Sequence, residues 1–75
     1  MQAKDMKQIV SLMAASSHTR ITDIAARMNH SHQWLYGRMA RQKFSLAELK
    51  QLANVCGYEL KIEFIDSNGD VITYR

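Results

Sequence analysis

The sequence predicts a mainly α-helical domain in which four short helices are followed by a C-terminal β-hairpin. Three observations lead to this fold class. Apolar residues recur at helical spacing as far as residue 56, a capping box starts one helix at Ser45, and from Leu60 the apolar residues alternate with a period of two. We therefore expect a single domain over residues 1–75, with a helical core at 4–57 and a hairpin at 58–75.

The first two helices are predicted from amphipathic runs. A helix over residues 4–15 has an inward face of apolar side chains three and four residues apart, namely Met6, Ile9, Val10 and Met13. After a small polar stretch, Thr19 is placed to cap a second helix of about two turns. The inward face of that helix consists of Ile21, Ile24, Ala25 and Met28.

A tight turn is predicted before the third helix. Asn29 tolerates the left-handed conformation that ends a helix, and Ser31 is a good N-cap for the helix that follows. Leu35 and Met39, four residues apart, point inward, and we expect the helix to run to about Arg41. Trp34 is expected at the edge of the core.

The fourth helix has the clearest start in the chain. Ser45 and Glu48 form a capping box, while Phe44 and Leu49 are spaced as a hydrophobic staple. The residues expected on the inward face are Leu46, Leu49, Leu52, Ala53 and Cys56. Gly57 should then end the helix in the left-handed conformation.

The C-terminal segment alternates between apolar and polar residues, as a half-exposed strand does. Residues 66–69, with sequence DSNG, suit a type I turn followed by a glycine bulge. This turn would set Phe64 opposite Ile72 and Ile62 opposite Tyr74. The tail is therefore predicted to be a hairpin.

Composition excludes several classes of protein. The N-terminal region contains neither a signal-peptide core nor a membrane span, and the single cysteine, Cys56, cannot form an internal disulfide, so we expect a cytoplasmic protein. Three histidines, His18, His30 and His32, without paired cysteines are better explained as surface residues than as metal ligands. No nucleophile and base arrangement or phosphate-binding loop is apparent. We expect no enzyme activity, no cofactor and no bound metal.

Charge is distributed unevenly along the chain, whose net charge is +3. Residues 1–56 contain eight basic and three acidic residues, whereas residues 57–75 contain two basic and four acidic ones. A cationic helical region favours a polyanionic partner such as nucleic acid. Basic side chains also decorate the surfaces of many helices, so this signal alone does not decide the function.

The order of these parts resembles the lambda-repressor-like helix-turn-helix family of bacterial and phage regulators. The residues that carry the resemblance are ITDIAARM at 21–28, the turn at 29–31, Trp34-Leu35 with Arg38-Met39, and FSLAEL at 44–49 leading to Gly57. The resemblance implies a transcriptional regulator, a repressor in particular, that binds double-stranded DNA with the helix at 31–41 in the major groove. The family's common glutamine at the start of its second helix is absent here.

If the third helix enters the groove, its outward side carries Gln33, Tyr36, Gly37, Ala40 and Arg41. Gln33 is suited to adenine, and Tyr36 to a base edge, a thymine methyl or a phosphate. The residues expected to contact DNA are Arg20, Thr22, Ser31, His32, Gln33, Tyr36, Gly37, Arg41 and Lys43. Ordinary solvated surface is the competing interpretation of this face.

A two-stranded hairpin is marginal in water on its own, so it should pack on helices or on another sheet. We expect it to join two copies into a dimer that matches a palindromic operator, through Ile62, Phe64, Val71, Ile72 and Tyr74. The alternative is a hairpin that only covers its own core. A different class of function also stays open, in which the chain is an antitoxin-type or protein-interaction module and the hairpin binds a partner protein.

Overall fold

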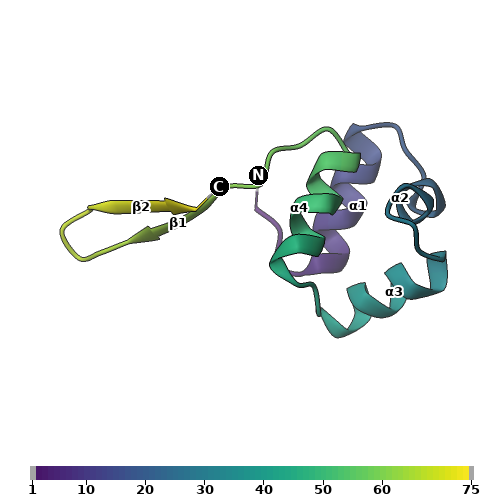
Figure 1. The fold of residues 1–75 in the computed structure, drawn as a ribbon, viewed down its shortest axis with the longest axis horizontal. Helices are drawn as coiled ribbons and strands as arrows, with labels where there is room; N and C mark the ends of the chain where they lie inside the picture. The colour runs from purple at the N-terminus through teal and green to yellow at the C-terminus, as the bar shows by residue number, and fades with distance from the viewer. Residues whose placement is uncertain (1, 75) are drawn as a thin grey trace.

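The computed structural model describes residues 2–74, and within them it contains four helices followed by one two-stranded antiparallel sheet (Figure 1). The elements are α1 (Met6–Ser16), α2 (Ile21–Arg27), α3 (His32–Arg41), α4 (Leu46–Val55), β1 (Ile62–Ile65) and β2 (Val71–Tyr74). The predicted fold class is confirmed. No helix in this part of the chain has the length and apolar character needed to cross a membrane.

The first connection differs from the sequence expectation. Helix α1 begins at Met6 rather than at residue 4, because the Asp5 side chain caps it by accepting from the Gln8 amide at 2.8 Å. Thr19 does not cap α2. Its hydroxyl donates instead to the Ser17 carbonyl at 3.1 Å, within the turn that His18 makes with a φ of 53°, so Arg20 occupies the cap position without a side-chain bond.

The turn between α2 and α3 has the predicted chemistry. Asn29 has a φ of 62°, and the Ser31 hydroxyl accepts a hydrogen bond from the Trp34 amide at 3.1 Å. At the other end of α3, Gln42 takes the left-handed conformation with a φ of 54°. A glutamine therefore closes the helix at a position that the sequence did not identify as left-handed.

Both ends of α4 also follow the prediction. The Ser45 hydroxyl accepts from the Glu48 amide at 3.1 Å, and the Glu48 carboxylate accepts from the Ser45 amide at 2.7 Å, which completes the capping box. Gly57 follows the helix with a φ of 77°. Phe44 is half-buried against the core, as a residue that precedes the cap is expected to be.

The core lies between the four helices, and most of the predicted inward residues of α2, α3 and α4 are buried in it, whereas Ile21, Leu46 and Leu49 are only half-buried. The buried side chains are Val10, Ala14, Ile24, Ala25, Met28, Leu35, Met39, Leu52, Ala53 and Cys56. Helix α1 buries Val10 fully and Ala14 almost fully, while the predicted inward residues Met6, Ile9 and Met13 are only partly buried. Helices α2 and α3 share this core and pack against each other.

The hairpin has the predicted turn and register. Ile62 pairs with Tyr74 and Phe64 pairs with Ile72. The Gly69 amide donates to the Asp66 carbonyl at 3.1 Å, the Asp66 amide donates to the Asp70 carbonyl at 3.0 Å, and Gly69 has a φ of 86°. These bonds describe a type I turn with a glycine bulge.

The hairpin does not cover the core of its own chain. It extends away from the four helices, which lie together at the other end of the molecule (Figure 1). Phe64, Ile65 and Ile72 are each at least 65% exposed, whereas Lys50 of α4 approaches the base of the hairpin with its Nζ 4.6 Å from the centre of the Tyr74 ring. The alternative of a hairpin folded over its own helices is therefore wrong, because the chain leaves the helical core before β1 begins.

The two sides of α3 should respond differently to truncation. Leu35 is fully buried, so Leu35→Ala should reduce the free energy of unfolding by about 2–5 kcal/mol. Gln33 is exposed, and Gln33→Ala should change it by less than about 0.5 kcal/mol. Urea denaturation followed by circular dichroism measures both. Equal losses in the two variants would contradict the inward and outward faces described for α3.

Candidate nucleic-acid interface

Helix α3 is held in place by an aromatic cluster at the edge of the core. The rings of His30 and Trp34 stack with centroids 3.6 Å apart and planes at 7°, and Phe44 meets Trp34 edge-on at 6.5 Å. Trp34 therefore packs at the edge of the core, as the sequence predicts. The cluster joins the turn before α3 to the segment after it, so both ends of the helix are restrained.

A cross-helix brace made by Arg38 adds to this restraint. Its guanidinium carbon lies 5.0 Å from the centre of the Trp34 ring, and Nη1 donates to the Lys43 carbonyl and to Glu48 Oε1, each at 3.2 Å. Arg38 thus joins α3 to the start of α4. Sequence reasoning missed this role, because the only local signal was the capping box that contains Glu48.

The Glu48 carboxylate accepts hydrogen bonds both from the Ser45 amide in the cap of α4 and from the Arg38 guanidinium. The Ser45 amide that donates to it holds the pKa of this carboxyl below its ordinary value of 4.5. Partial burial works in the opposite direction, and the Ser45 hydroxyl, Arg38 and His30 lower the pKa further. The charged form is therefore the one that the fold stabilises.

The opposite side of α3 faces solvent and is polar. Gln33, Ala40 and Arg41 are exposed, and Tyr36 keeps 47% of its surface accessible. His32 meets the Tyr36 ring edge-on, with centroids 6.3 Å apart. One helix face thus presents an amide, a phenol and a guanidinium, and we call Gln33, Tyr36, Gly37, Ala40 and Arg41 the outer face of α3.

Gly37 lies at the middle of the outer face of α3, and the Arg41 side chain folds back toward it. A Cβ added at Gly37 would be 3.2 Å from Arg41 Nη2. The missing side chain therefore leaves room for the guanidinium beside the helix backbone. This places a positive charge near the centre of the face rather than only at the end of the helix.

The remaining predicted site residues lie around this face or on the preceding helix. Ser31 is the N-cap of α3, and its hydroxyl is engaged by the Trp34 amide, whereas exposed Lys43 follows the helix. Arg20 and Thr22 lie at the start of α2, so they belong to a separate element. The Arg20 side chain is 83% exposed and pairs with Asp23 at 3.2 Å, an exposed ion pair that contributes little to stability and leaves Arg20 accessible.

Arg27, at the end of α2, makes a hydrogen bond to the backbone of α4. Its Nη1 donates to the Val55 carbonyl at 3.5 Å, which satisfies a carbonyl at the end of α4. Gln51 similarly donates to the Met28 carbonyl at 3.3 Å and joins α4 to the end of α2. These bonds fix how α2 and α4 pack, and neither was apparent from the sequence.

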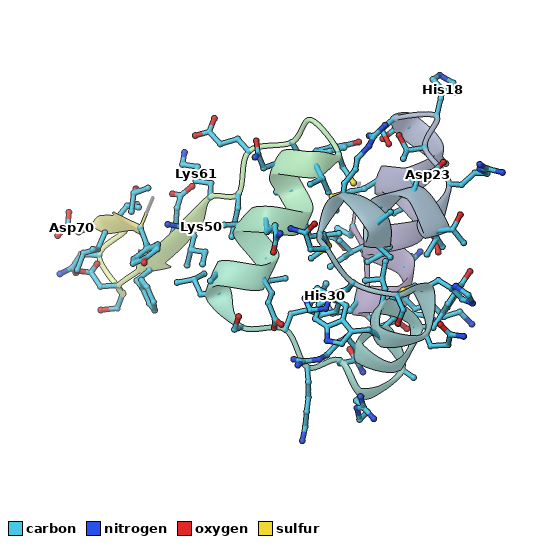
Figure 2. The ribbon with its side chains drawn as sticks, turned by 45° about the vertical axis from the view of Figure 1, so that its right-hand side comes forward. His18, Asp23, His30, Lys50, Lys61 and Asp70 are labelled. Carbon is cyan, nitrogen blue, oxygen red and sulfur yellow. The ribbon has the colours of Figure 1, made fainter. Side chains whose placement is uncertain are left out.

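The histidines and the cysteine do not come together. His18 lies at the connection after α1, whereas His30 lies at the connection before α3 (Figure 2). Among residues 2–74, no three side chains of His, Cys, Asp or Glu are grouped so that they could hold a metal ion. Burial raises the pKa of the Cys56 thiol, while Arg27 lowers it to a smaller extent, so the neutral thiol is favoured and acts as a core side chain.

In comparisons with known proteins, no protein-family model, no curated protein and no solved structure matches this chain. The function of this chain is therefore inferred from its own residues and their geometry. Of the predicted DNA-contacting residues, Gln33, Tyr36, Gly37 and Arg41 lie on one side of α3, where Gly37 is half-buried and the others are exposed. Arg20 is the N-cap of α2, and Thr22 lies in its first turn.

The pKa of Glu48 gives the fold a measurable pH dependence. Because its pKa is lower in the folded chain, ionised Glu48 contributes stability above pH 4.5, and this contribution is lost as the pH falls through the lowered pKa. Glu48→Gln should be less stable than the wild type at pH 7, since it keeps the cap but loses the charge near Arg38.

Thermal unfolding between pH 7 and pH 2.5 measures this difference. The two proteins should become closer in stability on the acid side, where the wild-type carboxyl is protonated and neutral like the amide. A difference in stability that stays constant over the whole range would show that the ionised form has no special role.

Proposed function

We propose that this chain is a sequence-specific double-stranded DNA-binding protein that inserts α3 into the major groove. The observation that supports this most strongly is the contrast between the two sides of α3. Leu35 and Met39 fix one side in the core, Arg38 braces the helix to α4, and the outer face is exposed and polar. A rigidly held helix that presents hydrogen-bonding side chains after a tight turn is the arrangement by which helix-turn-helix proteins read DNA.

The residues of the outer face suit contacts with base edges. The Gln33 amide matches the donor and acceptor pair of adenine, and Tyr36 suits a base edge, a thymine methyl or a phosphate. Gly37 and Ala40 have the smallest side chains on the face, so the backbone of α3 can approach the floor of the groove. Gln33 and Tyr36 would therefore carry the sequence preference.

Phosphate contacts would come from the ends of the two helices. Arg41 and Lys43 are basic and exposed at the end of α3, and Ser31 and His32 lie at its start, where backbone amides are available. Arg20 and Thr22 would contact the same backbone from the start of α2. Such contacts position the protein without selecting a sequence. Bound at a promoter in the cytoplasm, the protein would act as a transcriptional repressor.

The exposed hairpin favours a second candidate function. Phe64 and Ile72 are exposed on the same side of the hairpin and form an apolar surface that a protein partner could cover, as expected for an antitoxin-type or other protein-interaction module. Binding through such a surface should depend little on salt, whereas phosphate contacts make DNA binding fall steeply as the salt concentration rises. The two functions use opposite ends of the molecule and are therefore separable by mutation.

Selection of bound sites from random duplexes tests the DNA proposal directly. The wild type should enrich a motif, and Gln33→Ala or Tyr36→Ala should relax the preference at one base position, at a cost of about 1–3 kcal/mol for the preferred site. Arg41→Ala should weaken binding to all sequences alike. It should also reduce the slope of log affinity against log salt concentration by about one, because one phosphate contact is lost.

Lys7→Ala, at an exposed residue on α1, serves as the matched control for loss of a basic side chain. It should bind the selected site more tightly than Arg41→Ala. If the wild type enriches no motif, or if the Gln33 and Tyr36 variants keep the wild-type preference, α3 does not read DNA.

Gly37→Ala separates binding from stability. Alanine at this helical position should raise the free energy of unfolding by up to about 1 kcal/mol, because glycine is a poor helix former and the nearby Arg41 side chain is flexible enough to move. The same methyl group would hold α3 away from the bases and displace Arg41, so affinity for the selected site should fall. Thermal unfolding and fluorescence anisotropy measure the two effects. Unchanged affinity in the variant would contradict close approach of α3 at Gly37.

A further inference from the structure

The hairpin carries an apolar side that the helices of its own chain leave exposed. In the observed register, Ile62, Phe64, Ile72 and Tyr74 lie on one side of the two-stranded sheet. Phe64 is 65% and Ile72 73% exposed. A two-stranded sheet with so little covering is marginal in water, and it gains stability when further strands are added.

The hydrogen-bonding phase of the hairpin determines which backbone groups are available for another strand. Because the Asp66 amide donates to the Asp70 carbonyl, these two residues face each other across the hairpin. In an antiparallel ladder every second pair is bonded, so Ile72 and Tyr74 also point their amides and carbonyls toward β1. Those of Val71 and Thr73 therefore point to the outer edge of β2.

The two outer edges differ in charge. On β1 the residues at the edge are Ile65 and Glu63, and the Glu63 carboxylate pairs with Lys61 Nζ at 3.2 Å. Charged side chains of this kind discourage the addition of a strand. On β2 the corresponding residues are Val71 and Thr73, which are uncharged and β-branched. The β2 edge is thus the one that accepts another strand.

We propose that β2 pairs antiparallel with β2 of a second copy of this chain, with Ile72 on the twofold axis. Val71 then lies opposite Thr73 of the second copy, and the outward amides and carbonyls of both residues are bonded in each direction. Ile72 faces Ile72 of the second copy across the close, non-bonded pair. The product is a four-stranded sheet in the order β1-β2-β2-β1, with the four apolar residues of each copy on the same side.

Charge complementarity favours a second copy as the occupant of this edge. In the proposed register, Asp70 lies opposite Tyr74 of the second copy, and the ring of Tyr74 is where Lys50 Nζ sits in each chain. Asp70 lies toward the tip of the hairpin and Lys50 at its base, as Figure 2 shows. Antiparallel pairing therefore brings Asp70, near the tip of one hairpin, close to Lys50 on α4 of the other copy. The twofold axis makes this contact occur twice.

A proline test distinguishes the two edges. The Thr73 amide points outward in the monomer, so Thr73→Pro should leave the hairpin paired but remove a bond to the second copy. Glu63→Pro is the matched control, because Glu63 lies directly opposite Thr73 and its amide points to the other edge. Sedimentation equilibrium of the full chain without DNA should show a dimer for the wild type and for Glu63→Pro, and a monomer for Thr73→Pro.

Circular dichroism should show unchanged helix content in both proline variants, since the hairpin extends away from the helices. A monomeric wild type at about 100 μM, where a specific dimer of micromolar affinity is nearly complete, would overturn the proposal. A dimer that Thr73→Pro leaves intact would overturn it equally.

Cysteine cross-linking tests the register. In a Cys56→Ala background, Ile72→Cys should form a disulfide between two copies on mild oxidation, because the two Cα atoms at the axis would be about 4.5 Å apart. Thr73→Cys should cross-link at least tenfold more slowly, since its two copies would lie beyond disulfide range. Faster cross-linking at residue 73 than at residue 72 would refute the proposed register.

Charge reversal tests the proposed contact between Asp70 of one copy and Lys50 of the other. Asp70→Lys and Lys50→Asp should each raise the dimer dissociation constant about tenfold, and the double variant should restore most of the loss. Failure of the double variant to recover would overturn the pairing of these two residues. All of these measurements are made without DNA, so they succeed or fail independently of the proposed DNA binding.

Discussion

The arrangement of the helices depends on the burial of two side chains of α3, Leu35 and Met39. Both side chains enter a core formed by all four helices, so α3 cannot rotate about its axis without exposing them. In a chain of 75 residues the core is small, and each fully buried side chain is a large share of the stability. The polar outer face of α3 faces solvent because the apolar face has no other place to be buried.

Polar contacts fix the position of α3 relative to α4, in addition to this hydrophobic packing. Arg38 lies over Trp34 and reaches the Glu48 carboxylate, which also caps α4. One carboxylate therefore sets both the start of α4 and its position relative to α3. Hydrophobic burial alone would allow α3 to slide along the core, whereas the brace and the stacked His30 ring fix its ends.

Local signals in the sequence were sufficient for several features that depend on neighbouring residues. The capping box at Ser45, the left-handed Asn29 and the bulged turn at Gly69 all involve residues within a few positions of one another, and each was predicted. Thr19 was assigned wrongly because its hydroxyl has a competing acceptor in the turn at His18. The outer face of α3 was predicted from helical geometry, and the structure leaves its side chains exposed or half-buried.

Features that depend on distant residues were not predictable in this way. The Arg38 brace joins residues ten positions apart, and the Arg27 bond to the Val55 carbonyl joins residues 28 apart. The projection of the hairpin was also not evident, because alternation defines which sides of a strand are apolar but not what covers them. Gln42 gave no signal because glutamine has no particular preference for positive φ.

The three helix-to-helix connections each reverse the chain through one non-glycine residue with positive φ, at His18, Asn29 and Gln42. Side chains at such positions restrict the backbone more than glycine would, and the connections are only a few residues long. Much of the backbone entropy that a looser loop would lose on meeting a ligand has therefore already been lost during folding. Helix α3 would therefore bind any ligand in the conformation that it already has. Its specificity would come from shape complementarity with the ligand and not from a conformational change of the helix.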